Sequence, residues 1–309
     1  MNLAHVHIIL NHVPALGSVV TLGLFIVALA RGHEMLKRVS LGLFSFLALL
    51  TIPVYVTGKV AQATIVDNPL VSQVLIVPHE DAALQAFMMI MLTGAFAWFG
   101  LWQFRRIARF AAWNLGIVLL LGALTVVFMV QAGTMGGAIR HDEIRSGDEV
   151  TPAVGLLTAA SVGAFVNDST WIWPAAEVLH FVGLSLLFGV VALINLRMLG
   201  AMKEASFAAF HRLLPWGVLG LAVNTVTGMM FFIALPDQYT DNIAFFWKIG
   251  LMTLAGLDLL YVTAFDQPWA VGPGVDAPVS EKAIAASAIA LWIGVIYFGR
   301  MLPFLGFAF

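Results

Sequence analysis

The sequence contains no cysteine, and only 10% of its 309 residues are Asp, Glu, Lys or Arg. Without cysteine the chain can form no disulfide, thiolate metal site, iron–sulfur cluster or covalently attached c-type haem. Soluble domains carry roughly a quarter charged residues, so an ordinary soluble domain is excluded. The sequence also has no nucleotide-binding fingerprint and no soluble catalytic domain. We therefore expect any substrate chemistry to belong to a partner, and we expect no nucleic-acid partner.

Hydrophobic residues make up 61% of the chain, and they form eight runs of about the 20 residues that a membrane-spanning helix needs. The runs lack the short alternation of a membrane β-barrel. We therefore predict an all-α membrane protein with eight transmembrane helices in two four-helix up-down bundles. The first run is too long for a removable signal peptide and lacks a cleavage pattern, so we expect a retained helix. The runs are 5–31, 38–64, 82–104, 110–134, 172–196, 206–235, 242–265 and 282–305.

The longest polar break in the chain predicts its division. We expect a first bundle at 1–137, an extracytoplasmic linker at 138–171 and a second bundle at 172–309, with no sequence repeat between the halves. Under an eight-helix topology ten of the fifteen Lys and Arg residues fall on one side of the membrane. The positive-inside rule places that side in the cytoplasm. The sequence thus favours a multi-pass protein of a bacterial inner membrane with both termini in the periplasm.

Five of the eight histidines gather at the outer ends of the first four helices. They are His5, His7, His12, His79 and His141. His5 and His12 share a helix face and His7 points away from both, if the helix is continuous. Neutral imidazole suits haem iron, copper and zinc, and the carboxylates beside His79 and His141 are candidates for orienting the rings. The candidate ligands are His12, His79 and His141, with His7 next. Each histidine taken alone is more typical of an interfacial residue in the headgroup region, and the cofactor or metal site is favoured only by their convergence.

The second half places polar residues inside its helices. Glu177 and His180 share one face at membrane depth, which indicates function by default. His180 is a candidate metal or haem ligand. His211 is a possible partner, although upright helices put the two at different depths. Arg197 and Asp258 both lie near the inner ends of helices, which favours a structural ion pair between them.

Both halves resemble four-helix bacterial membrane families of unknown function. The first resemblance rests on HVHIILNHVPALG at the N-terminus, Thr57-Gly58, His79-Glu80 and a GG-x-x-x-H stretch that ends at His141. The second rests on H-x-x-G-x-x-x-x-x-G from His180, a terminal LR-x-LG, Thr227-Gly228 and Lys248. Copper-resistance membrane proteins and b-type cytochromes are similar at a greater distance. The resemblance implies an inner-membrane protein with histidine-dependent chemistry.

These patterns favour a membrane electron-transfer subunit, a b-type cytochrome. It would hold one or two non-covalent haem b groups and pass electrons between a periplasmic redox protein and the quinone pool. Glu177 would move the accompanying proton. The other subunits of a membrane redox complex are its expected partners in the lipid bilayer. One alternative is a membrane protein that binds or transfers copper or zinc, which the absence of cysteine weakens. The other is a cofactor-free anchor of a larger complex.

Overall fold

The computed structural model describes residues 2–145 and 157–305, and all its long elements are helices. Eight stretches are long and apolar enough to cross a membrane. The predicted all-α membrane protein with eight spanning helices is therefore confirmed. The chain divides into two compact units, each of which carries four spans. Unit 1 comprises residues 1–100 and 110–162, and unit 2 comprises 101–109 and 163–309. Part of the expected linker lies outside the described residues.

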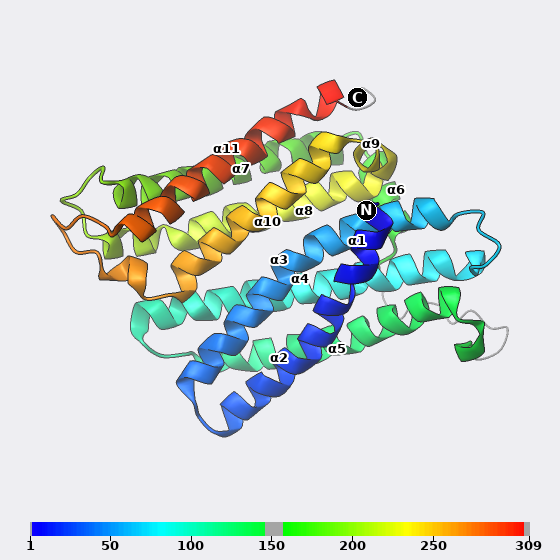
Figure 1. The fold of residues 1–309 in the computed structure, drawn as a ribbon, viewed down its shortest axis with the longest axis horizontal. Helices are drawn as coiled ribbons and strands as arrows, with labels where there is room; N and C mark the ends of the chain where they lie inside the picture. The colour runs from blue at the N-terminus through cyan, green and yellow to red at the C-terminus, as the bar shows by residue number, and fades with distance from the viewer. Residues whose placement is uncertain (1, 146–156, 306–309) are drawn as a thin grey trace. The chain divides into compact units, whose positions relative to one another are not determined.

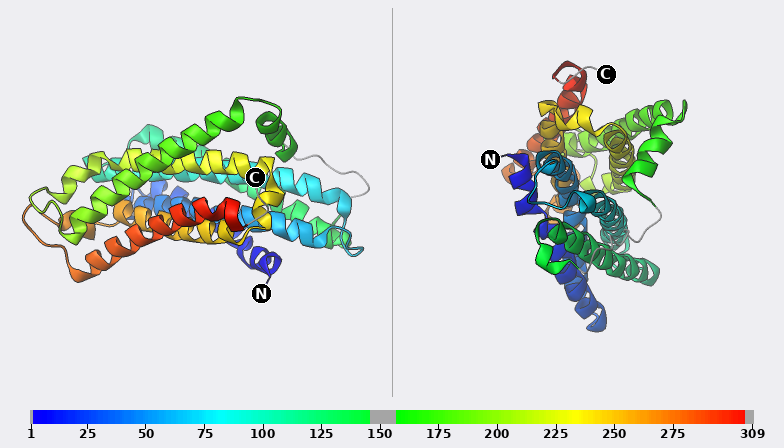
Figure 2. Two further views of the ribbon diagram at one scale, coloured as in Figure 1. Left: turned by 90° about the horizontal axis from the view of Figure 1, so that it is seen from above. Right: turned by 90° about the vertical axis from the view of Figure 1, so that its right-hand side faces the viewer.

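Successive spans of unit 1 run in opposite directions (Figure 1). Its first span is broken at Asn11 into two helices, and Figure 2 shows the first of them as a short segment of its own. Pro14 follows the break, where a missing backbone N–H is tolerated because it lies in the first turn of the second helix. The helices are α1 (Leu3–Leu10), α2 (His12–Ala30), α3 (Glu34–Ile65), α4 (Ile76–Ile107) and α5 (Ala112–Arg140).

Unit 1 is held together by apolar packing and by polar bonds between its helices. The hydroxyls of Thr93 in α4 and Thr125 in α5 lie 2.8 Å apart. Asn114 donates its side-chain amide to the carbonyl of Phe96 at 3.0 Å. Within a bilayer, small and hydroxyl-bearing residues of this kind replace the hydrophobic driving force between helices. The outer surface of α1 and α2 is apolar, with Ile8, Leu16 and Val20 more than 60% exposed, as a lipid-facing surface requires.

Unit 2 contains the other four spans and several short helices. α7 packs against α8 and α11, and α10 packs against α11 (Figure 1). Residues 101–109, which include the last turns of α4, also belong to this unit. The long helices are α7 (Ile172–Leu199), α8 (Leu214–Ala234), α10 (Ile243–Ala264) and α11 (Val279–Leu305). The short helices are α6 (Ala159–Asn167), η3 (Phe207–Arg212), α9 (Pro236–Thr240) and η4 (Gln267–Ala270), and α6 begins just before the unit boundary.

The contact between α7 and α8 depends on Gly220. A Cβ atom at this position would lie 2.6 Å from the carbonyl oxygen of Gly183 and 2.8 Å from the amide nitrogen of Leu187. Both atoms are backbone and cannot move aside without moving the helix. The absence of a side chain at Gly220 therefore sets how closely these two spans approach.

We predict that Gly220→Ala destabilises the protein by about 1–3 kcal/mol, because the new methyl group overpacks the α7–α8 contact. Thermal unfolding in detergent would measure the change. Gly189→Ala in α7 is the matched control, since a Cβ there meets nothing within 4 Å. If both substitutions lowered the stability equally, the close approach of α7 and α8 at Gly220 would not be the cause.

Candidate functional site

Two histidines of unit 1 are each fixed by a neighbouring helix. Nδ1 of His7 in α1 lies 3.0 Å from the carbonyl oxygen of Val54 in α3. Nδ1 of His79 in α4 lies 3.0 Å from the carbonyl oxygen of Ala132 in α5. A carbonyl oxygen only accepts, so Nδ1 carries the hydrogen in both rings. In each neutral ring the free lone pair is therefore on Nε2.

A glycine borders each of these rings. A Cβ atom on Gly58 of α3 would lie 3.1 Å from Cε1 of His7, and one on Gly136 of α5 would lie 2.9 Å from Cε1 of His79. The glycines therefore let the two imidazoles lie directly against the backbone of the neighbouring helix. Both rings are half-buried, and they are close enough for a charge on one to affect the other. His7 and His79 thus form the candidate site of unit 1.

The carboxylates beside His79 have other partners. Glu80 accepts from Lys59 at 2.6 Å in a largely buried ion pair that joins α4 to α3. Asp81 accepts from the backbone amide of Ala159 at 2.9 Å. From the sequence we expected these two carboxylates to orient the imidazole of His79. Neither of them does so. Backbone carbonyls take that role instead, and carbonyls are also common partners of metal-bound histidines.

The expected ligand set of His12, His79 and His141 is not brought together. His12 is exposed and its Nδ1 lies 3.2 Å from the carbonyl of Ile8. His141 lies after α5, 58% exposed, and its Nδ1 is 2.9 Å from a carboxylate oxygen of Glu143. His7, which we ranked below these two, is near enough to His79 for their charges to interact. The helix is broken at Asn11, so face counting through one continuous helix does not apply to His7 and His12.

Unit 2 holds a third half-buried imidazole in the same manner. Nδ1 of His180 in α7 lies 2.7 Å from the hydroxyl of Thr227 in α8. That hydroxyl donates to the carbonyl of Val223 at 2.7 Å, so it accepts from His180 and leaves Nε2 free. Phe231 lies against the ring, with 5.9 Å between the ring centroids. Lys248 of α10 is close enough to influence the charge of His180 electrostatically.

The two units share one pattern, although their sequences show no repeat. In each, a histidine of the first span lies against a Thr-Gly pair near the end of the second span. A basic residue early in the third span lies against a glycine late in the fourth. The corresponding residues are His7, Thr57-Gly58, His79 and Gly136 in unit 1 and His180, Thr227-Gly228, Lys248 and Gly299 in unit 2. The principal difference is that an ammonium replaces the second imidazole.

One other expectation for the second half is corrected. Arg197 does not pair with Asp258. It is fully buried and donates to the carbonyls of Ala205, Gly272 and Val275. Glu177 lies three residues before His180 in the same helix, α7, where it is exposed and accepts from the indole of Trp173 at 3.3 Å.

His211 does not join His180. Thr227, which holds His180, lies sixteen residues further along the chain than His211, about 24 Å at 1.5 Å per helical residue. His211 is instead enclosed by Trp102, stacked at 5.7 Å, and by Trp269, edge-on at 5.1 Å. Its Nε2 is buried without a hydrogen-bond partner. Burial, together with the nearby Arg105 and Arg106, lowers the pKa of His211 to about 4.

Comparisons with protein-family models, curated protein sequences and solved structures gave no match. The resemblance of the two halves to membrane families therefore stays a prediction. Within residues 2–145 and 157–305, no group of three or more His, Asp or Glu side chains is placed to hold a metal ion. The candidate sites are the His7–His79 pair of unit 1 and the His180–Lys248 pair of unit 2.

We predict that His211 makes stability depend on acidity. The unfolded chain has the ordinary histidine pKa of 6.5 and the folded chain one of about 4. The unfolded state therefore binds the proton more tightly, and the neutral ring's contribution is complete above pH 6.5 and is lost as the pH falls toward about 4. His211→Phe should remove this part of the dependence.

Thermal unfolding in detergent across this pH range measures the effect. The exposed His5 supplies the matched control, since His5→Phe should keep the pH dependence of the unmodified protein. If His211→Phe and the unmodified protein lost stability in parallel on acidification, another group would be responsible.

Proposed function

We propose that unit 1 binds a haem b between His7 and His79, and that the protein is a membrane electron-transfer subunit of a redox complex. The observation that carries the proposal is the pair of half-buried imidazoles, each with Nδ1 engaged and Nε2 free. Two imidazoles of this kind would hold a non-covalent haem, which needs no cysteine. Bound haem would supply one-electron chemistry, and the protein would supply its ligands and environment.

The arrangement of donors fits haem better than a bare metal ion. Structural zinc takes four protein ligands and catalytic zinc three, and the described residues offer no group of that size. Two imidazoles from different helices are what a bis-histidine haem uses. The carbonyls of Val54 and Ala132 hold the rings in the ligating tautomer and increase the basicity of Nε2. Gly58 and Gly136 leave the neighbouring helix surfaces flat beside the rings.

We further propose that unit 2 exchanges electrons with the quinone pool at His180 and Lys248. The free Nε2 of His180 is a hydrogen-bond acceptor, and the ammonium of Lys248 is a donor. A quinol offers both a hydroxyl that donates and an oxygen that accepts, so it complements the pair. Phe231 and Trp173 lie beside His180 with 4.8 Å between their ring centroids and would provide aromatic surface for the ring.

The distribution of Lys and Arg predicts which side of the membrane the proposed haem site faces. The His7–His79 site lies at the end of unit 1 where α1 begins, which the positive-inside rule assigns to the periplasm. A periplasmic redox protein would exchange electrons there, and other subunits would carry any substrate chemistry. The host membrane in this proposal is a bacterial inner membrane with both termini periplasmic.

The haem proposal predicts that His7→Ala or His79→Ala abolishes or shifts a b-type absorption band in the purified protein, because each removes an imidazole that would hold the haem. His12→Ala and His141→Ala are matched controls from the same end of unit 1, and they should leave the spectrum unchanged. Reduced-minus-oxidised spectra with iron analysis make the measurement, and gel filtration confirms that each variant is folded.

Two results would contradict the proposal. One is a protein that is folded but carries no haem after expression with ample haem supply. The other is a haem band that disappears with His12 or His141 and survives loss of His7 and His79. Stoichiometric copper or zinc in place of iron would favour metal handling.

The quinone proposal predicts that Lys248→Met slows reduction of the haem by a soluble quinol about tenfold or more. Loss of a hydrogen bond to a charged group costs about 1.5–3 kcal/mol, and 1.4 kcal/mol corresponds to a factor of ten. Stopped-flow absorption at the haem band measures the rate. The half-exposed Lys203 provides the control, and Lys203→Met should reduce at the unmodified rate with the same spectrum. An unchanged rate in Lys248→Met would exclude Lys248 from the quinol site.

A further inference from the structure

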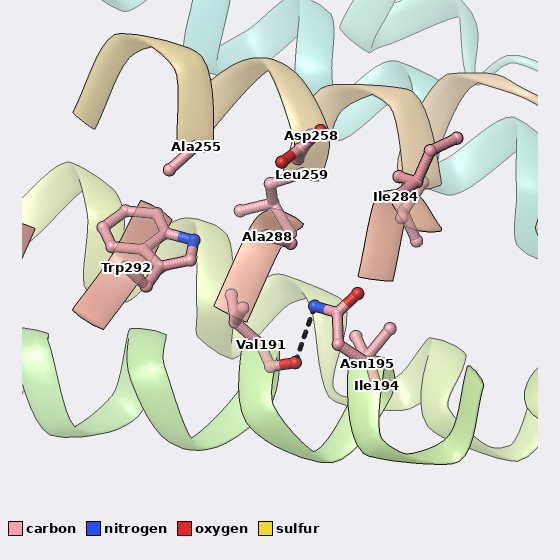
Figure 3. A pocket seen from close by; sticks show the side chains of 10 residues that line it. Val191, Ile194, Asn195, Ala255, Asp258, Leu259, Ile284, Ala288 and Trp292 are labelled. Atoms are coloured by element: carbon pink, nitrogen blue, oxygen red, sulfur yellow. Dashed lines mark hydrogen bonds between the residues drawn. The ribbon is translucent and has the colours of Figure 1, made fainter. Parts of the chain in front are cut away.

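A small cavity lies inside unit 2 between α7, α10 and α11 (Figure 3). Its volume is about 10 Å³, which is the space of roughly one water molecule. None of the histidines discussed above lines it. The described residues that line it are apolar except for Asn195, Asp258 and Trp292, and the apolar ones are Val191, Ile194, Ala255, Leu259, Val262, Ile284 and Ala288.

Two polar atoms on this cavity have no hydrogen-bond partner. They are Nε1 of Trp292 in α11 and Oδ2 of Asp258 in α10, and both are buried. The Trp292 side chain is only 2% exposed, so bulk water does not reach its N–H group. Leaving a buried donor or acceptor unsatisfied costs about 1–3 kcal/mol each. The two atoms are complementary, because the indole only donates and a carboxylate only accepts.

The third polar residue of the cavity does not supply the missing bonds. Asn195 donates its amide nitrogen to the backbone carbonyl of Val191 at 2.8 Å, as the dashed line in Figure 3 shows. Neither Asp258 nor Trp292 receives that hydrogen. A water molecule, which both accepts and donates, is the partner that fits the space and the two orphaned atoms.

Charged groups of the neighbouring helices contact other atoms. Nε and Nη2 of Arg197 in α7 donate to loop carbonyls, while its Nη1 is buried without a hydrogen-bond partner among the described residues. On α11, Glu281 accepts from the hydroxyl of Tyr261 at 2.9 Å and Lys282 pairs with Asp276 at 3.1 Å. Among the described residues that line the cavity, Asp258 alone is ionisable. Within the part of the chain that the structure describes, no Lys or Arg forms an ion pair with its carboxylate.

We propose that the cavity holds water and that Asp258 takes up and releases a proton there. In uptake, a hydronium in the cavity gives its proton to Oδ2, which leaves a neutral carboxylic acid and a water molecule. Release is the reverse. Trp292 donates to the water oxygen and positions it. Ionisable residues inside membrane helices usually mark proton or ion pathways, and a carboxyl with its own water is suited to such a path.

The proposal goes beyond electron transfer and does not depend on haem. It gives unit 2 a proton-binding site near the C-terminal end of α10. Lys248, which belongs to the His180–Lys248 pair, lies near the other end of the same helix. A protonated carboxyl also removes the cost of an unpaired charge in a poorly hydrated place. Protonation is thus the chemical change that this site can undergo by itself.

Infrared difference spectroscopy of the full chain in lipid vesicles tests the proposal. Acidification from neutral pH should produce the carbonyl stretch of a protonated carboxyl group that shifts in D₂O, because the proton exchanges with cavity water. Asp258→Asn should remove this band. Asp241→Asn changes an exposed aspartate in the same way and should retain it.

Trp292→Phe provides a second variant in case Asp258→Asn does not fold. It keeps the carboxyl but removes the indole donor to the water, so the band should remain and shift in frequency. Persistence of the band in folded Asp258→Asn would overturn the proposal. So would a band that fails to shift in D₂O, or one that is identical in Trp292→Phe and the unmodified protein.

Discussion

The structure depends on the high cost of leaving an N–H group unbonded where water is scarce. Three half-buried imidazoles meet that cost by donating Nδ1–H to the next helix, to a carbonyl for His7 and His79 and to a hydroxyl for His180. The bond can form only if the helices approach closely, and glycines beside the rings permit this. One requirement therefore explains the tautomers, the position of the rings and the small residues that oppose them.

The sequence was sufficient for the fold, because apolar length and the scarcity of charge determine spanning helices directly. The expected run 38–64 corresponds to α3 at Glu34–Ile65, which extends further because its polar ends remain helical. The site was only partly predictable. The sequence favoured His12, His79 and His141 and placed His7 next, whereas the structure leaves His12 and His141 exposed and half-buries His7 and His79. A one-residue break in a helix changes which side chains share a face, and nothing in the local composition indicates which carbonyl a ring will meet.

Contacts made by backbone atoms were the least accessible to sequence reasoning. Arg197 was matched with Asp258 because both are charged, yet its Nε and Nη2 donate to three loop carbonyls. The likeness between the two units was hidden for a related reason. It rests on a few positions, such as Thr57-Gly58 and Thr227-Gly228, within helices whose other residues are free to vary as long as they stay apolar. The two units therefore share this arrangement of residues in space although their sequences show no repeat.

His7 and His79 are each held on two sides, and this affects the reorganisation energy of a charge placed between them. Each ring is held by a hydrogen bond on one nitrogen and by a glycine backbone along its edge, so it cannot rotate to follow a change in the charge of whatever Nε2 contacts. An environment that is already arranged needs little rearrangement when charge appears or leaves. A group held between these two rings would therefore gain and lose an electron with a small reorganisation energy, equally in both directions.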